Sequence, residues 1–178
     1  YSGVRPLLDD GHKSARSVTR DYRLILDKSF GPAILSVFGG KITTYRRLAE
    51  DALDTLTGDE KHWTHTAPLP GGDIPNGDMG AFIKSRQARY DWLPDDLVAR
   101  YCRLYGTRIN ELLKTVNNIN DMGTHYGDNI YEVEIDYLSE HEWARTTEDV
   151  LWRRTKLGLH ISDKTVYNLE RAGLLRGS

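Results

Sequence analysis

The stretch from Ile34 to Arg46 constrains the fold of this chain more than any other part of its sequence. It opens on a short apolar run, Ile34–Phe38, whose β-branched and aromatic residues predict a buried strand. Gly39 and Gly40 follow directly, and two glycines let the backbone turn sharply and let a ligand approach closely. The stretch therefore predicts a strand that ends in a glycine turn.

A helix is predicted after this turn. Apolar residues recur at helical spacing over residues 45–56, and Thr43 or Thr44 is expected to cap the first turn. The free N–H groups and the positive end of the helix dipole would then lie at the glycine turn, beside Lys41. Such a site suits an anion or the electron-rich edge of a ring. Strand–glycine–helix units are common, however, and many of them bind nothing and serve only to turn the chain. It is not a Walker A loop, because Leu35 replaces the first glycine, and it lacks the third glycine of a dinucleotide fingerprint.

Composition and charge exclude several classes of function. The chain has 178 residues, of which 39% are hydrophobic and 28% are charged, as in soluble globular proteins. A net charge of −2 argues against a general nucleic-acid binder, and no run is long and apolar enough to span a bilayer. The single cysteine, Cys102, lies in a helical pattern, where a buried structural thiol is favoured over a nucleophile. No signal peptide is visible, and because the chain opens on Tyr1 without an initiator methionine, we expect a fragment.

The hydrophobic period changes near Pro68. Before this point, residues 18–26 alternate as in a strand, with Tyr22, Leu24 and Leu26 on one face. Proline and glycine then crowd a span that predicts a linker or an ordered loop. Beyond the span the pattern is helical, and helices are predicted over residues 82–92, 94–105, 108–116, 130–143 and 146–158 and from residue 162 onward, with residues 117–127 as a connection.

The predicted fold is therefore mainly α. Residues 1–57 are expected to be the last strands and a helix of an α/β domain, residues 58–80 a linker loop, and residues 81–178 a helical C-terminal domain.

Basic residues are the candidates for binding an anion. Arg5 and Arg20 stand near predicted strand ends, where a guanidinium suits a planar or tetrahedral anion, although ordinary surface arginines are favoured from the residues alone. Residues 149–156 combine aromatic and basic side chains that could bind phosphate or lipid headgroups. A helix with Trp152 anchored in the core and its arginines solvated is the favoured interpretation there.

The histidines do not predict a metal site. His62 and His65 lie in the linker without a carboxylate or thiol spaced to complete a ligand set. His141 opens a pattern similar to a zinc-protease helix, but Arg145 replaces the second histidine. No metal is therefore predicted.

Taken together and in order, several segments resemble the FAD-dependent glycerol-3-phosphate dehydrogenases of the respiratory type. Each segment is weak evidence, and the ordered set is specific. The matching segments are residues 1–7, 19–22, 35–46, 69–72, 131–134 and 142–158. The resemblance implies that this chain is the C-terminal part of such an enzyme, with residues 1–57 ending its FAD-binding and substrate-binding domain. It also implies that the glycine-rich dinucleotide-binding unit and the catalytic base lie outside the chain.

The resemblance further implies roles for particular residues. The motif that lies against the flavin in the family corresponds to Gly39, Gly40, Lys41, Ile42, Thr43 and Thr44. The residues that would hold the substrate phosphate are Arg5, Arg20 and Lys41. Two guanidiniums and an ammonium suit a phosphate dianion, and a helix N-terminus at the flavin edge would stabilise the anionic reduced ring.

The implied reaction is hydride transfer from C2 of glycerol 3-phosphate to flavin N5, which gives dihydroxyacetone phosphate. Electrons would then pass to a membrane quinone, so a cytoplasmic enzyme on the inner face of the cell membrane is expected, with a homodimer as an option. A related oxidase would pass the electrons to oxygen instead. The alternative from another class is a non-catalytic helical interaction module. No catalytic residue is assigned to this chain, and alone it is expected to be inactive.

Overall fold

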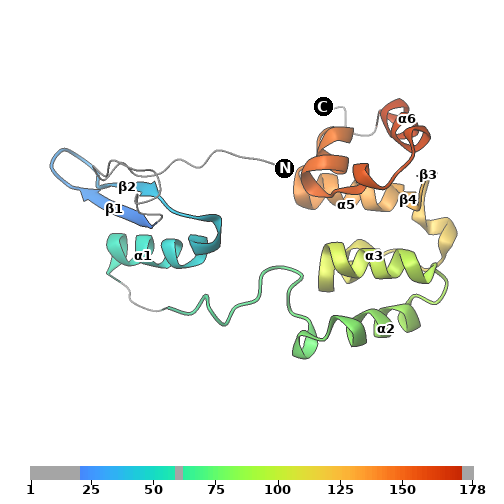
Figure 1. Ribbon diagram of the computed structural model, residues 1–178, viewed down its shortest axis with the longest axis horizontal. Coiled ribbons are helices and arrows are strands. Elements are labelled where there is room, and N and C mark those ends of the chain that lie inside the picture. The colour runs from blue at the N-terminus through green and yellow to red at the C-terminus, as the bar shows by residue number, and fades with distance from the viewer. Residues whose placement is uncertain (1–20, 59–61, 174–178) are drawn as a thin grey trace, which may run out of the picture. The chain divides into compact units, whose positions relative to one another are not determined.

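The computed structural model describes residues 21–58 and 62–173 of the chain (Figure 1). The chain divides into two compact units, residues 1–68 and residues 69–178. Within the described ranges, no helix combines the length and the apolar character needed to cross a membrane. The assignment of the two parts to particular enzyme domains stays a prediction.

The described residues of the first unit form a β-hairpin and one helix. Strands β1 (Tyr22–Asp27) and β2 (Ile34–Gly39) pair antiparallel, and a 3-10 turn (Ile42–Thr44) and the helix α1 (Tyr45–Thr57) follow. Figure 1 shows α1 running along the hairpin, and it contacts β1. The predicted order of strand, glycine turn and helix is confirmed.

The hairpin has two unlike faces. Along β1, the half-buried Tyr22, Leu24 and Leu26 alternate with exposed residues, so the predicted shared face is confirmed. The buried strand predicted for β2 is wrong for this chain, because Ile34 is 61% exposed and Phe38 is 42% exposed. Both stand opposite the exposed positions of β1 in the register, on the face away from Tyr22.

The second unit is mainly helical, as the sequence predicts. Its longer helices are α2 (Met79–Arg89), α3 (Asp95–Tyr105), α5 (Glu132–Glu142) and α6 (Asp163–Ala172). The shorter elements are 3-10 turns at Pro75–Gly77, Gly106–Arg108, Ile119–Met122 and Leu157–Leu159, the helix α4 (Ile109–Leu112), the strands β3 (His125–Gly127) and β4 (Ile130–Tyr131), and a π-helical turn (Asp149–Arg154). In Figure 1, α2 and α3 lie side by side.

Capping residues set several of these boundaries. The Asp78 side chain accepts the Ala81 N–H at 2.9 Å at the start of α2. The starts predicted at Pro94 for α3 and at Ser162 for α6 are confirmed. Gly106 ends α3 with a positive φ of 56°, which a glycine adopts readily.

Buried aromatic and aliphatic residues of α3, α4 and α5 form the centre of this unit's core. Tyr101 and Cys102 of α3, Ile109 of α4 and Leu138 of α5 are all fully buried. The buried structural thiol predicted for Cys102 is therefore confirmed. A close-packed core of this kind favours one arrangement of the helices.

Local periodicity predicted two segments wrongly. The helix expected over residues 108–116 is a 3-10 turn followed by the short α4. The connection expected over residues 117–127 contains β3, and its pairing with β4 delays the next helix to Glu132. The Glu132 N–H donates to the Thr124 carbonyl at 2.9 Å, and the Glu132 carboxylate accepts the Thr124 N–H at 2.8 Å. These bonds divert the backbone from the helix that the sequence pattern suggests.

The helix predicted over residues 146–158 begins as expected, because the Thr146 hydroxyl accepts the Asp149 N–H at 3.0 Å, but it becomes π-helical at Asp149 and ends early, at Arg154. The carboxylate of Asp149 accepts the N–H groups of Arg145 and Thr146, both at 3.0 Å, which holds the start of the π-helical turn. At its end, the N–H of Thr155 donates to the Val150 carbonyl at 3.2 Å, and the Thr155 hydroxyl donates to the same oxygen. The wider i→i+5 bonding follows from these fixed ends.

Trp152 is not the core anchor that the sequence suggested. It is 43% exposed, and its indole lies against Gly158, where an added Cβ would come within 2.5 Å of the ring. Arg153 pairs with Glu148 at 3.0 Å and Asp149 at 2.8 Å instead of being merely solvated. The aromatic and basic side chains of this stretch therefore stabilise the turn itself.

Candidate functional site

The turn between β2 and α1 requires its two glycines. Gly39 and Gly40 have positive φ values of 74° and 96°. A Cβ on Gly40 would lie 3.3 Å from Leu48 Cδ1 and 3.6 Å from Tyr22 Cβ. Any other residue at Gly40 would combine backbone strain with crowding, so the glycine turn fits closely between strand and helix.

Lys41 and Thr44 close the following 3-10 turn on each other. The Lys41 carbonyl accepts the N–H and the hydroxyl of Thr44, both at 3.0 Å. The Lys41 N–H donates to the Thr44 hydroxyl oxygen at 3.2 Å. Thr44 does occupy the N-cap position of α1, as predicted, but its hydroxyl bonds no N–H group of the helix. The hydroxyl holds Lys41 in place instead of capping α1.

Three positively polarised groups meet at this turn. The N–H groups of Ile42 and Thr43 have no acceptor among the described residues, because they are the first N–H groups of the 3-10 turn. The half-buried Lys41 forms no ion pair with any carboxylate of residues 21–58 or 62–173. The arrangement can bind an anion or the electron-rich edge of a ring.

The structure bears on only part of the predicted site. The residues predicted to contact a cofactor, Gly39, Gly40, Lys41, Ile42, Thr43 and Thr44, form this one turn. Of the residues predicted to hold a phosphate, Lys41 lies in the same turn, whereas Arg5 and Arg20 lie outside the described residues. The binding roles of all of them stay predictions.

Sequence reasoning missed a hydrogen bond that joins strand and helix beside this turn. The Tyr22 hydroxyl, at the start of β1, donates to Asp51 Oδ2 in α1, and this bond raises the pKa of the phenol. Alternation along β1 places Tyr22 on the face that α1 covers. No pattern in the sequence pairs it with Asp51.

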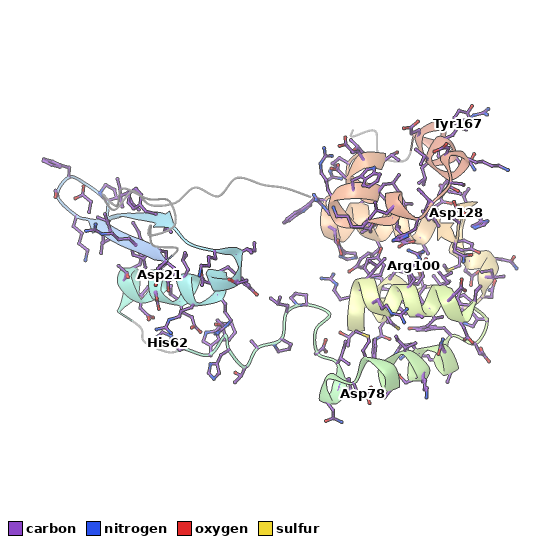
Figure 2. All side chains as sticks on the ribbon, viewed as in Figure 1. Asp21, His62, Asp78, Arg100, Asp128 and Tyr167 are labelled. Carbon is purple, nitrogen blue, oxygen red and sulfur yellow. The ribbon has the colours of Figure 1, made fainter. Side chains whose placement is uncertain are left out.

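His62 also has partners that the sequence did not indicate. Its Nδ1 lies 3.2 Å from Glu50 Oε2 and its Nε2 lies 2.9 Å from Asp54 Oδ2, and Figure 2 shows it beside α1. The bond to Glu50 raises the pKa of His62, and the Thr64 hydroxyl and His62 lower the pKa of Glu50 to about 2. Ligand atoms of Asp51, Asp54 and His62 lie within 4.8 Å of one another, as a metal would need, but ion pairing already accounts for this arrangement.

Two cavities lie in the second unit, away from these residues in the sequence. One, of about 280 Å³, has Glu111, Asp136 and Tyr137 in its lining, and the other, of about 230 Å³, has Arg89 and Trp92. Neither lining includes a residue of the predicted site.

Comparison with known proteins identifies relatives over most of the chain. Residues 62–174 match the family described as the C-terminal domain of alpha-glycerophosphate oxidase. Glycerol-3-phosphate dehydrogenase of Pseudomonas aeruginosa is 48% identical over 167 residues, which cover 91% of this chain and 32% of the relative. Aerobic glycerol-3-phosphate dehydrogenase of Escherichia coli is 45% identical over 167 residues, which cover 91% of this chain and 33% of the relative.

A relative with another named substrate is equally similar. D-erythritol 1-phosphate dehydrogenase of Brucella abortus is 46% identical over 171 residues, which cover 92% of this chain and 33% of the relative. The chain thus spans about a third of the length of the curated relatives that it matches.

Proposed function

The chain belongs to the family of the C-terminal domain of alpha-glycerophosphate oxidase, and from this premise we propose that it is the C-terminal part of an FAD-dependent dehydrogenase. The whole enzyme oxidises glycerol 3-phosphate to dihydroxyacetone phosphate. Relatives named glycerol-3-phosphate dehydrogenase, 43% to 48% identical to this chain, support that substrate. The observation that carries the proposal is the turn at residues 39–44. It brings Lys41 together with the N–H groups of Ile42 and Thr43, which have no acceptor among the described residues.

The turn fits one edge of a flavin. The N–H groups of Ile42 and Thr43 can donate to the pyrimidine edge of the ring. Lys41 and the positive end of α1 favour the negative charge of the reduced ring. FAD, when bound, supplies the hydride acceptor. The sequence holds no glycine fingerprint for the pyrophosphate, so the adenosine half binds outside this chain.

Arg5, Arg20 and Lys41 hold the phosphate of the substrate. Guanidinium forks bond phosphate oxygens in pairs, and the lysine adds a compact charge between phosphate and flavin. Holding the phosphate orients C2 of the substrate toward the flavin. The base that accepts the hydroxyl proton lies outside this chain.

The electrons pass from the reduced enzyme to a quinone at the membrane surface. The enzyme is cytoplasmic and peripheral on the inner face of the cell membrane. The family name includes an oxidase, so oxygen is the alternative acceptor.

D-erythritol 1-phosphate is a second candidate substrate. The Brucella abortus relative that carries this name is 46% identical over 92% of the chain, on a par with the glycerol-3-phosphate dehydrogenases. Both molecules are polyol phosphates, so the same cationic residues serve either one. Discrimination then depends on residues that contact the remaining hydroxyl groups.

The test uses the full-length protein that carries this chain. We expect bound flavin with its visible absorbance, and anaerobic bleaching of that absorbance by glycerol 3-phosphate. Faster bleaching by D-erythritol 1-phosphate would select the second substrate. Reoxidation by a soluble quinone, compared with oxygen, identifies the acceptor. A purified protein that holds no flavin and oxidises neither substrate would favour the interaction module.

A further inference from the structure

The hydroxyl of Tyr22 ties the start of β1 to the middle of α1. It donates to Asp51 Oδ2, and along the chain the hairpin and the glycine turn separate residue 22 from residue 51. Arg47 Nε lies 4.0 Å from the same carboxylate oxygen. The Tyr22–Asp51 bond therefore links α1, the helix that follows the turn, directly to β1, the strand that pairs with β2.

The glycine turn lies directly against this link. Tyr22 stands opposite Gly39 in the hairpin register, and the position of a Cβ on Gly40 is 3.6 Å from Tyr22 Cβ. On the helix side, the same position is 3.3 Å from Leu48 Cδ1, and Leu48 precedes Asp51 by nearly one helical turn. Tyr22 thus pairs with Gly39 in the hairpin register and holds α1 with its hydroxyl.

We propose that Tyr22 and Asp51 are positioning residues that hold the turn of Lys41, Ile42 and Thr43 in the geometry that receives the flavin. This inference rests on the proposed function. Neither residue touches the flavin in this proposal. They act by fixing the angle between β2 and α1, and so the direction of the backbone donors at the start of the helix.

The physical reason is preorganisation. Donors stabilise a developing negative charge most when their positions are already fixed, because no reorganisation is then needed. Negative charge gathers at the pyrimidine edge of the flavin on reduction, so a loosened turn weakens binding of the reduced ring more than of the oxidised ring. Loss of the Tyr22–Asp51 bond therefore lowers the midpoint potential of the bound flavin as well as its affinity.

The experiment compares variants of the full-length flavoenzyme. Tyr22→Phe removes only the hydroxyl, Asp51→Ala removes the acceptor, and Asp51→Asn keeps a carbonyl oxygen that can still accept the bond. Tyr167→Phe is the matched control, because it makes the same chemical change at an exposed tyrosine of α6. The measurements are the FAD dissociation constant, the midpoint potential by dye titration and the melting temperature.

We expect Tyr22→Phe and Asp51→Ala to raise the FAD dissociation constant on the order of tenfold, as for loss of a hydrogen bond to a charged group. Both should lower the midpoint potential, with Asp51→Asn close to wild type and Tyr167→Phe unchanged. A lower melting temperature with an unchanged potential would make the bond merely structural and would overturn the inference. An unchanged FAD affinity and potential in both variants, in an enzyme that glycerol 3-phosphate still reduces, would overturn it while the proposed function stands. A wild-type protein without flavin would overturn both.

Discussion

The fully buried carboxylate of Glu134 accepts two hydrogen bonds from Arg100, from Nη1 to Oε1 at 2.7 Å and from Nη2 to Oε2 at 2.8 Å. The same Arg100 Nη2 donates to the Asn129 carbonyl at 2.8 Å, and the Tyr105 hydroxyl donates to Glu134 at 2.7 Å. Figure 2 shows Arg100 on α3, on the side toward α5. One carboxylate thus joins α3 to α5 and, through Arg100, to the hairpin of β3 and β4.

Removing one partner of this pair should destabilise the helical unit strongly. Arg100→Ala leaves the Glu134 carboxylate buried without its countercharge, and we expect the free energy of unfolding to fall by about 3–5 kcal/mol. Urea unfolding followed by far-UV circular dichroism measures this change. Arg103→Ala, at an exposed arginine of the same helix, is the control and should stay near wild type. A loss below about 1 kcal/mol for Arg100→Ala would show that the pair contributes no more than a surface ion pair.

The close approach of Gly71 and Gly106 makes a second prediction. A Cβ on Gly106 would lie 1.9 Å from the Gly71 carbonyl oxygen, which also accepts the Thr107 N–H at 3.0 Å. Gly106→Ala must therefore separate the two backbones, and we expect a loss of stability above about 4 kcal/mol. Gly77→Ala has a similar positive φ of 66° with no atom near the added Cβ, and should cost only about 1 kcal/mol. Equal melting temperatures for the two variants would show that steric contact at Gly106 is unimportant.

The contact between His62 and α1 should depend on pH in two directions. The pKa of His62 is raised, chiefly by the bond to Glu50, so its contribution is complete below the ordinary value of 6.5 and disappears as the pH rises through the raised pKa. The pKa of Glu50 is lowered from 4.5 to about 2, chiefly by the Thr64 hydroxyl, so its contribution is complete above 4.5 and disappears as the pH falls toward 2. We therefore expect the contact to be tightest between pH 4.5 and 6.5.

Amide hydrogen exchange at Thr64 measures this dependence, because its N–H donates to Glu50 at 3.0 Å. Protection should be greatest within that pH window, after correction for the intrinsic exchange rate. His62→Gln should abolish the loss of protection above neutral pH and keep the loss at acidic pH. If protection changed equally in both proteins, His62 would have no part in it.

Lys41 and Arg20 should differ in their effects on the whole enzyme. Arg20→Ala should weaken substrate binding by a few kcal/mol, the rough scale for losing one partner of a buried charged pair, and should leave flavin content nearly intact. Lys41→Ala should reduce both substrate use and flavin retention, because Lys41 lies in the glycine turn. Steady-state kinetics and flavin absorbance per protein separate these outcomes. Flavin loss in Arg20→Ala but not in Lys41→Ala would reverse the assigned positions.

Some features of this chain follow from neighbouring residues alone. The run from Ile34 through the two glycines to α1 depends on β-propensity, positive φ and helical spacing, all of which act within a few residues. The starts of α3 and α6 depend on Pro94 and Ser162 for the same reason. The glycine turn and the residues predicted to bind at it form one contiguous segment, so chain connectivity alone brings them together.

Other features depend on contacts between distant residues. The pairs Tyr22–Asp51 and Arg100–Glu134 join residues 29 and 34 positions apart. The hairpin of β3 and β4 is held by Arg100 at the Asn129 carbonyl, and by the Thr124–Glu132 bonds at its base. Such contacts depend on how elements rotate and pack against one another, and hydrophobic period does not encode that. Periodicity therefore specified the glycine turn with its flanking strand and helix, and the longer helices of the second unit, whereas packing set where α5 begins, how residues 149–154 coil and which side chains hold the glycine turn.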